Sequence, residues 1–128
     1  MTVQIDISYG ELLDKISILE IKLERILEPA KLENVSRELS ILNRGWINSP
    51  VDRCAVEDER LSLKSINETL WVIEDDIRDK EAHKSFNQEF IDLARSVYKT
   101  NDERARLKRV INEKLGSSLK EEKSYQSY

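Results

Sequence analysis

Leucine and isoleucine residues at steps of three and four are the feature that most limits what this chain can fold into. They recur in four stretches, of which the first runs through Leu12, Ile16, Leu19, Leu23 and Ile26. The other stretches cover residues 32–46, 63–77 and 86–111. This spacing gathers apolar side chains on one side of an α-helix, and that side must be buried against other helices. The sequence therefore predicts an all-α fold, an antiparallel four- or five-helix bundle with long, coiled-coil-like helices.

Capping and helix-breaking residues set the expected bounds of these helices. Ser8 and Glu11 have the S-x-x-E spacing of a capping box, which predicts a first helix from Ser8 to about Glu28. Pro29 then either stops this helix or opens the next one. Gly45 is the expected cap of the second helix. The later helices are expected over residues 30–44, 56–81 and from 85 to 97 or beyond.

The fourth stripe leaves two architectures open. Thr100 and Glu103 have the spacing of another capping box, which predicts a separate fifth helix over residues 101–115. The apolar stripe nevertheless continues in phase through this point, which predicts one long helix. Gly116 ends the helix in either case. The domain is therefore expected to span residues 1–116, followed by a polar tail over residues 117–128.

The start of the chain predicts association with another molecule. Val3, Ile5 and Ile7 alternate with polar residues, as in a short strand. A lone strand is unstable, so this segment either packs as an extended arm or pairs with a second copy of the chain. Ile18 and Ile21 lie opposite the main stripe of the first helix. Together these features predict a protein partner or a homodimer.

Composition argues against several classes of protein. The formal net charge of −4 argues against a nucleic-acid binder, and no apolar run approaches the roughly 20 residues that cross a bilayer. The first residues lack the basic start and apolar core of a signal peptide, so a cytoplasmic location is expected. Cys54 is the only cysteine and His83 the only histidine. We therefore expect no disulfide, no metal site and no cofactor.

Polar residues interrupt the apolar stripes of three helices. The helical period places Glu20, Glu74 and Arg104 toward the core, with Asn67 and Thr100 beside them. A buried lone charge is strongly unfavourable, so these groups are expected to satisfy one another. The predicted interior polar cluster is then either a structural ion-pair network or a pocket in which Arg104 binds an anionic ligand. Such a ligand would be phosphorylated or carboxylated.

A basic segment near the end of the chain predicts a second contact. Residues 99–114 carry six basic and three acidic side chains, although the chain as a whole is acidic. We expect Arg106, Lys108 and Arg109 to form an outer basic contact for an anionic ligand or an acidic partner. A solvated helix face is the alternative interpretation.

Four carboxylates suggest a further possibility. Asp76 and Asp79 lie on the third helix, and Glu89 and Asp92 on the fourth. This arrangement is similar to the magnesium site of all-helical nucleotide pyrophosphohydrolases, in which acids on neighbouring helices hold the metal. The helical period argues against it, because Asp76 and Asp79 face away from the apolar stripe.

Two segments resemble a family of small, uncharacterised bacterial and phage proteins. They are ISYGELLDKISILEIKLERI near the start, and VYKTNDERARLKRVINEKLGSSL followed by EEKSY near the end. Some members are encoded beside, or fused to, lipopolysaccharide and glycosyltransferase functions. The resemblance implies an all-helical domain linked to surface-polysaccharide assembly, with no established activity. It also draws attention to junction and tail residues, namely Tyr98, Asn101, Asp102, Glu121, Glu122, Lys123 and Tyr125.

We interpret the sequence as that of a non-enzymatic protein-binding or accessory module, linked to lipopolysaccharide biosynthesis by the resemblance alone. The alternative is a small-molecule enzyme or binder that uses the interior polar cluster on an anionic ligand. A magnesium-dependent nucleotide pyrophosphohydrolase is the third interpretation. The sequence leaves enzymatic activity open.

Overall fold

Four α-helices and one short 3-10 helix make up the computed structural model, which describes all 128 residues. The elements are α1 (Tyr9–Arg25), α2 (Pro29–Ile47), η1 (Arg53–Val56), α3 (Glu57–Ala82) and α4 (Gln88–Leu115). The predicted all-α class is confirmed. Of the two states expected for the start of the chain, the structure shows the extended arm: residues 1–7 form no ladder within the chain, and Val3 and Ile5 are exposed. Pairing with a second copy stays a prediction.

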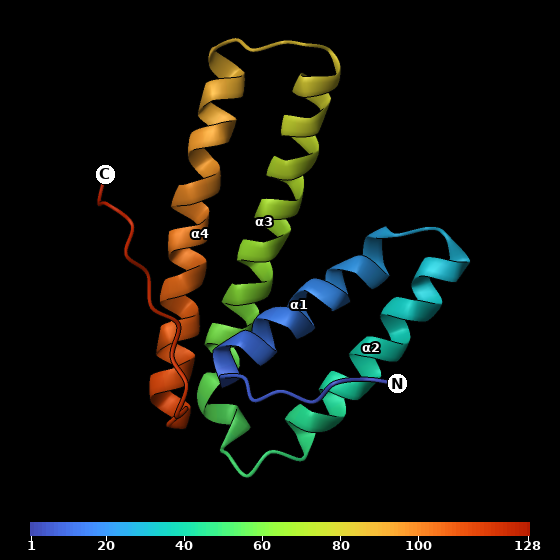
Figure 1. Cartoon of the computed structure of the whole chain (residues 1–128), viewed down its shortest axis with the longest axis vertical. Coiled ribbons are helices and arrows are strands. Elements are labelled where there is room, and N and C mark those ends of the chain that lie inside the picture. The colour runs from blue at the N-terminus through green and yellow to red at the C-terminus, as the bar shows by residue number, and fades with distance from the viewer.

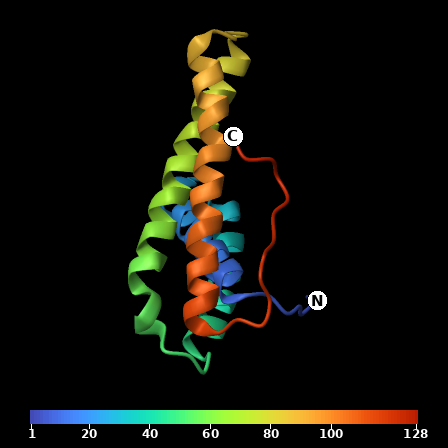
Figure 2. The same ribbon diagram turned by 90° about the vertical axis from the view of Figure 1, so that its left-hand side faces the viewer.

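The helices form two pairs that cross each other (Figure 1). α3 and α4 lie side by side along their whole length and are joined by residues 83–87. α1 and α2 form the second pair, in which α1 crosses the half of α3 and α4 nearest to η1 and α2 packs against α1. Figure 2 shows from another side that the other half stands clear of this second pair. We call this half, residues 72–97, the outer arm.

α4 is one continuous helix, so the separate fifth helix is wrong. It runs from Gln88 through Thr100 without a break. Continuing the helix keeps the apolar stripe in phase, and this outweighs a possible cap at Thr100. Asn87 starts the helix, because its Oδ1 accepts a hydrogen bond from the Phe90 N–H at 3.2 Å. Gly116 ends it in the left-handed conformation, with φ of 65°, as predicted.

The first two helices differ from their predicted bounds at their C-terminal ends. The Ser8 Oγ accepts a hydrogen bond from the Glu11 N–H at 3.1 Å, which confirms the predicted cap of α1. α1 ends at Arg25 rather than Glu28. The residue before a proline favours an extended backbone, and Glu28 has ψ of 121°. α2 continues through Gly45 to Ile47, so Gly45 is not its cap.

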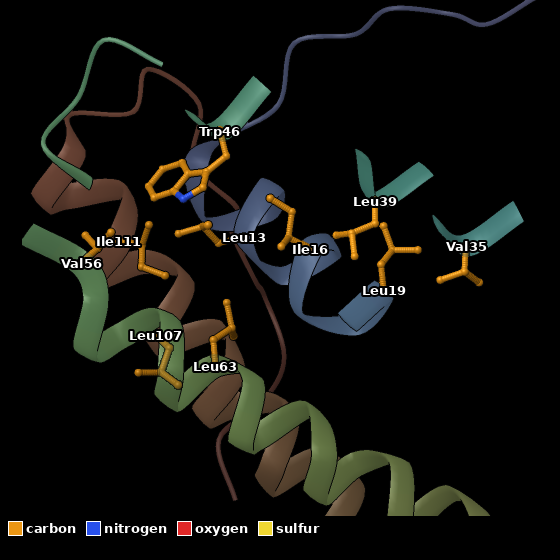
Figure 3. Packing of buried hydrophobic residues seen from close by; sticks show 10 residues of the cluster. All are labelled: Leu13, Ile16, Leu19, Val35, Leu39, Trp46, Val56, Leu63, Leu107 and Ile111. Atoms are coloured by element: carbon orange, nitrogen blue, oxygen red, sulfur yellow. The ribbon is translucent and has the colours of Figure 1, made fainter. Parts of the chain in front are cut away.

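The main hydrophobic cluster lies between α1 and α2 and where α1 meets η1, α3 and α4. All helices contribute to it, and Figure 3 shows its ten residues: Leu13, Ile16, Leu19, Val35, Leu39, Trp46, Val56, Leu63, Leu107 and Ile111. Only 20 of the 128 residues are buried, the last of them Asn112. The Ser117 N–H donates a hydrogen bond to the Asn112 carbonyl at 2.9 Å, which closes the last turn of α4. Residues 1–118 therefore contain the complete core and every helix cap.

α1 is covered on two sides. Ile21 is only 1% exposed and Ile18 is half-buried, because α1 packs against α3 and α4 as well as α2. The face that was expected to bind a second copy is thus occupied by the same chain. None of the helices combines the length and apolar character needed to cross a membrane.

Gly10 sets how closely α1 approaches α4. A Cβ atom built on Gly10 would lie 2.6 Å from the Lys108 carbonyl oxygen and 3.0 Å from the Lys108 Cα. The Gly10 N–H donates a hydrogen bond of 2.7 Å to the Asn112 Oδ1, which uses the same close approach. Any larger residue would force the two backbones apart, because a backbone atom cannot rotate away as a side chain can.

We expect Gly10→Ala to lower the free energy of unfolding by about 2 kcal/mol through this clash. Gly45→Ala is the matched control, since Gly45 lies inside α2 with open space where its Cβ would be. There the alanine should raise the free energy of unfolding by about 0.5 to 1 kcal/mol. Urea unfolding of both variants checks this. A stabilising effect at both positions would show that α1 and α4 do not make this close contact.

Candidate functional site

A buried polar network connects α1 to α3. Asp14, Ser17 and Asn67 are all at most 5% exposed. The Asn67 side-chain amide donates hydrogen bonds to the Asp14 Oδ1 at 2.8 Å and to the Ser17 Oγ at 2.7 Å. The Ser17 hydroxyl donates in turn to the Asp14 carbonyl at 2.8 Å. Of these three residues, only Asn67 was identified from the sequence.

The network continues to α4 through Lys108. Its ammonium lies 2.7 Å from the Glu11 Oε2 and 3.7 Å from the Asp14 Oδ2. A third carboxylate, that of Glu121 in the C-terminal tail, lies 3.0 Å away. The Lys108 side chain is only 8% exposed. One lysine thus holds carboxylates from α1 and the tail at the centre of the fold.

Placing Lys108 in an outer basic contact was therefore wrong. Helical period gives the direction of a side chain but not its depth, and Lys108 points inward beside α1. Arg106 and Arg109 are exposed, as expected. Arg106 pairs with Glu103 of its own helix at 2.6 Å. Such an exposed pair contributes little to stability.

Burial and ion pairing act in opposite directions on Glu11 and Lys108. For Glu11, burial raises the pKa, but the hydrogen bond and charge of Lys108, with help from Lys15, lower it to below its ordinary 4.5. For Lys108, burial lowers the pKa, but hydrogen bonds to Glu11 and Glu121 and the charge of Asp14 raise it above 10.5. Both groups are therefore charged at neutral pH.

Part of the predicted interior polar cluster comes together around Arg104. The Arg104 Nη1 donates a hydrogen bond to the Asn67 Oδ1 at 3.3 Å. Both residues line a groove of about 480 Å³ where α1 diverges from α3 and α4, and Glu74 lines it as well. The remaining lining residues are Ile18, Leu70, Trp71, Asp75, Arg78, Val97 and Asn101.

Two members of the predicted cluster lie elsewhere. Glu20 faces the side of α1 near Lys64, whose pKa is raised mainly by a hydrogen bond to Glu24 and further by the charge of Glu20. Thr100 is half-buried on α4 and does not line the groove. Glu74 lines the groove but is exposed, with its carboxylate 3.7 Å from Arg78. The structure thus joins Asn67 directly to Arg104, with Glu74 at the rim.

Arg104 and Asn101 have unused hydrogen-bonding capacity in this groove. No carboxylate lies within ion-pair distance of Arg104, and its one hydrogen bond is the long one to Asn67. The Oδ1 of Asn101 is buried and has no hydrogen-bond partner. A guanidinium normally finds an anion when it is removed from water. These two side chains could therefore bind a group that offers both a negative oxygen and a donor.

The junction and tail residues also come together. They line a second groove of about 560 Å³ on the other side of Arg104, between α4 and the tail: Tyr98, Asn101, Asp102, Glu121, Glu122, Lys123 and Tyr125, with Val97 and Ser124. The segments that carry the family resemblance are distant in sequence. They meet in space at Lys108, which pairs with Glu11 from the first segment and Glu121 from the last.

The four carboxylates considered for magnesium line one groove of the outer arm. This groove, of about 530 Å³, is bordered by Asp76, Asp79, Glu89 and Asp92. Glu89 is engaged by Lys80 at 2.6 Å. No three His, Cys, Asp or Glu side chains of the chain lie close enough to hold one metal ion. The single cysteine, Cys54, is exposed.

The fold and network define a small all-helical domain with a charged centre. The chain belongs to a family of unknown function, DUF6165, whose model matches residues 3–128. No curated protein and no solved structure matches it significantly. The family match spans the four helices and the tail, and it brings no activity with it.

The shifted pKa values of Glu11 and Lys108 make the free energy of unfolding depend on pH. The lowered pKa of Glu11 stabilises the fold above pH 4.5, and this contribution is lost as the pH falls through the lowered value. The raised pKa of Lys108 stabilises the fold below pH 10.5, and this contribution is lost as the pH rises through the raised value.

We therefore expect the difference in unfolding free energy between the native chain and Lys108→Gln to be constant from about pH 6 to about pH 9. It should shrink below pH 4.5 and again above pH 10.5. Urea unfolding at several pH values measures this difference. A difference that does not vary with pH would mean that Lys108 is uncharged or unpaired in the folded chain.

Proposed function

We propose that this antiparallel, coiled-coil-like bundle is a non-catalytic protein-binding module that self-associates through its outer arm. The supporting observation is that α1 crosses only one half of α3 and α4 while α2 packs on α1, which leaves the outer arm as a single layer (Figures 1 and 2). None of the ten residues of the main hydrophobic cluster lies in residues 72–97, where Ile73 is the one buried side chain. Helices gain most of their stability by burying an apolar face against another layer, and here that layer is missing.

Apolar side chains in the outer arm are incompletely covered. Val72, Phe86 and Ile91 are 46%, 55% and 47% exposed. Four others are only half-buried: Ile77, Phe90, Leu93 and Val97. Isolated exposed residues of this kind are ordinary on protein surfaces. Their concentration on an unsupported helix pair favours a surface that a partner covers.

A second copy of the chain fits this surface best. The outer arm carries seven acidic and four basic residues, whereas residues 99–114 of α4 carry three more bases than acids. A twofold arrangement would place the acidic arm of one copy beside the basic half of α4 in the other. Each contact would then occur twice, as in most homodimers. It would also supply each arm with the second layer that it lacks.

We expect light scattering to give twice the chain mass of 15.0 kDa for the native protein. Asp75→Lys with Asp76→Lys reverses the charge of the arm at two exposed positions without an ion pair. This variant should be a monomer, because the arm would then repel the basic half of α4. Glu33→Lys with Glu38→Lys makes the same charge change on exposed positions of α2 and should stay a dimer.

A monomer at every concentration of the native chain would contradict self-association. Equal weakening by both double variants would show a general charge effect rather than contact through the arm. The link to surface-polysaccharide assembly stays a prediction that rests on the family resemblance.

The groove at Arg104 favours a second candidate function, the binding of a small anionic ligand. The observation behind it is the Arg104 guanidinium, which has no carboxylate partner beside the unpaired Asn101 Oδ1. Trp71 and Leu70 supply apolar surface in the same groove. A phosphorylated or carboxylated molecule with an apolar portion would satisfy both the guanidinium and this surface.

This candidate is tested by titrating the protein with inorganic phosphate and, separately, with succinate. The NMR signal of the Trp71 indole reports binding in the groove. Arg104→Ala should weaken the response at least about tenfold, because the charge-assisted hydrogen bond is lost. Arg78→Ala is the matched control, since Arg78 lines the same groove but is exposed and pairs with Glu74. An unchanged response in Arg104→Ala would exclude the groove as an anion site.

A further inference from the structure

The C-terminal tail folds back along α4. Gly116 turns the chain, and residues 117–128 then run beside α4 toward its start (Figures 1 and 2). Every residue from Ser118 to Tyr128 is exposed. No apolar burial therefore holds the tail in place, and its position depends on a few polar and aromatic contacts.

Two contacts attach the tail to α4. The Glu121 carboxylate lies 3.0 Å from the Lys108 ammonium. The Tyr128 ring packs edge-on against the Tyr98 ring, with centroids 5.1 Å apart. Partial desolvation and the hydrogen bond and charge of Asp102 raise the pKa of the exposed Tyr128 hydroxyl. The two anchoring residues of the tail are seven positions apart, and their partners on α4 are ten positions apart.

Glu121 adds a third carboxylate around Lys108, beside those of Glu11 and Asp14. An ammonium has three hydrogens to donate, and the three carboxylates lie 2.7, 3.7 and 3.0 Å from it. Because Lys108 is nearly excluded from water, a carboxylate close to it is attracted more strongly than at the surface. The site therefore favours a carboxylate whether or not it belongs to this chain.

We propose that the face of α4 from Tyr98 to Lys108 is a binding site for an extended segment of a partner protein that carries a glutamate and an aromatic ring seven positions later, and that the tail is its resident occupant. Such a segment would place one carboxylate on Lys108 and an aromatic ring on Tyr98. The tail shows both the chemistry and the extended conformation that the site accepts. The proposal does not rest on self-association, because the contacts that carry it, Glu121 with Lys108 and Tyr128 with Tyr98, lie within one chain.

The tail then acts as a built-in competitor. A tethered segment has an effective concentration in the millimolar range, so it excludes weak ligands and yields to a segment that binds more tightly. Its few contacts and exposed backbone allow it to detach without unfolding the core. Detachment would uncover Lys108 and the groove shared by Arg104 and the tail.

A labelled peptide of residues 119–128 tests the site. Residues 1–118 contain every buried residue and helix cap, so we expect this shortened chain to keep the fold. Circular dichroism of the shortened chain checks that its helix content is unchanged. In fluorescence anisotropy we expect the peptide to bind the shortened chain. It should bind the full chain at least about tenfold more weakly, because the tethered tail occupies the site.

Peptide variants identify the contact without altering the folded chain. Glu121→Gln in the peptide should weaken binding at least about tenfold, because the charge-assisted contact with Lys108 is lost. Glu122→Gln removes an equal charge one position away, at a residue without an ion pair, and should bind nearly as well as the native peptide. Equal binding to the shortened and full chains, equal effects of the two substitutions, or no binding to the shortened chain would each overturn the proposal.

Discussion

The buried ammonium of Lys108 is the interaction on which the arrangement of the helices depends. It contacts Glu11 and Asp14 of α1 and Glu121 of the tail, and Asp14 extends the contact to Asn67 of α3. A lysine this deeply buried is strongly unfavourable without anionic partners. α1, α3 and α4 must therefore meet in one relative position if this charge is to be satisfied. The apolar cluster supplies most of the stabilisation, and the charged network selects which packing is adopted.

The small size of Gly10 is what allows α1 to come close enough to α4 for these ion pairs to form. It lets the α1 backbone approach the Lys108 carbonyl, and the Asn112 side chain fixes the approach through the Gly10 N–H. The same close contact brings Glu11 and Asp14 within reach of the ammonium. A family match over residues 3–128 includes both sides of this contact. The centre of the domain thus combines close backbone packing with ion pairing, while the outer arm and the grooves remain available for binding.

The sequence predicts the helices better than their contacts. Apolar period and capping residues located all four helices, and Ser8 and Gly116 were correct to the residue. Alternation over five residues predicted either an extended arm or a paired strand, and it could not choose between them because it carries no information about a pairing partner. Asp14 and Ser17 were missed because α1 has two buried faces, and the stronger apolar stripe hid the polar one. Their spacing from Gly10, at steps of four and three, was the signal that could have revealed it. Lys108 lies four residues after Arg104 and so faces the same way, but period alone cannot distinguish a buried lysine from a solvated one.

The free energy of unfolding of Lys108→Met, compared with that of Arg106→Met, tests the central role of Lys108 most directly. Both substitutions remove one positive charge from α4, but only Lys108 is buried among carboxylates. Lys108→Met should lose about 3 kcal/mol or more, because Asp14 is left as a buried carboxylate without an ion-pair partner. Arg106→Met should leave stability nearly unchanged. Equal effects of the two substitutions would contradict the account, since the fold would then not depend on a buried charge.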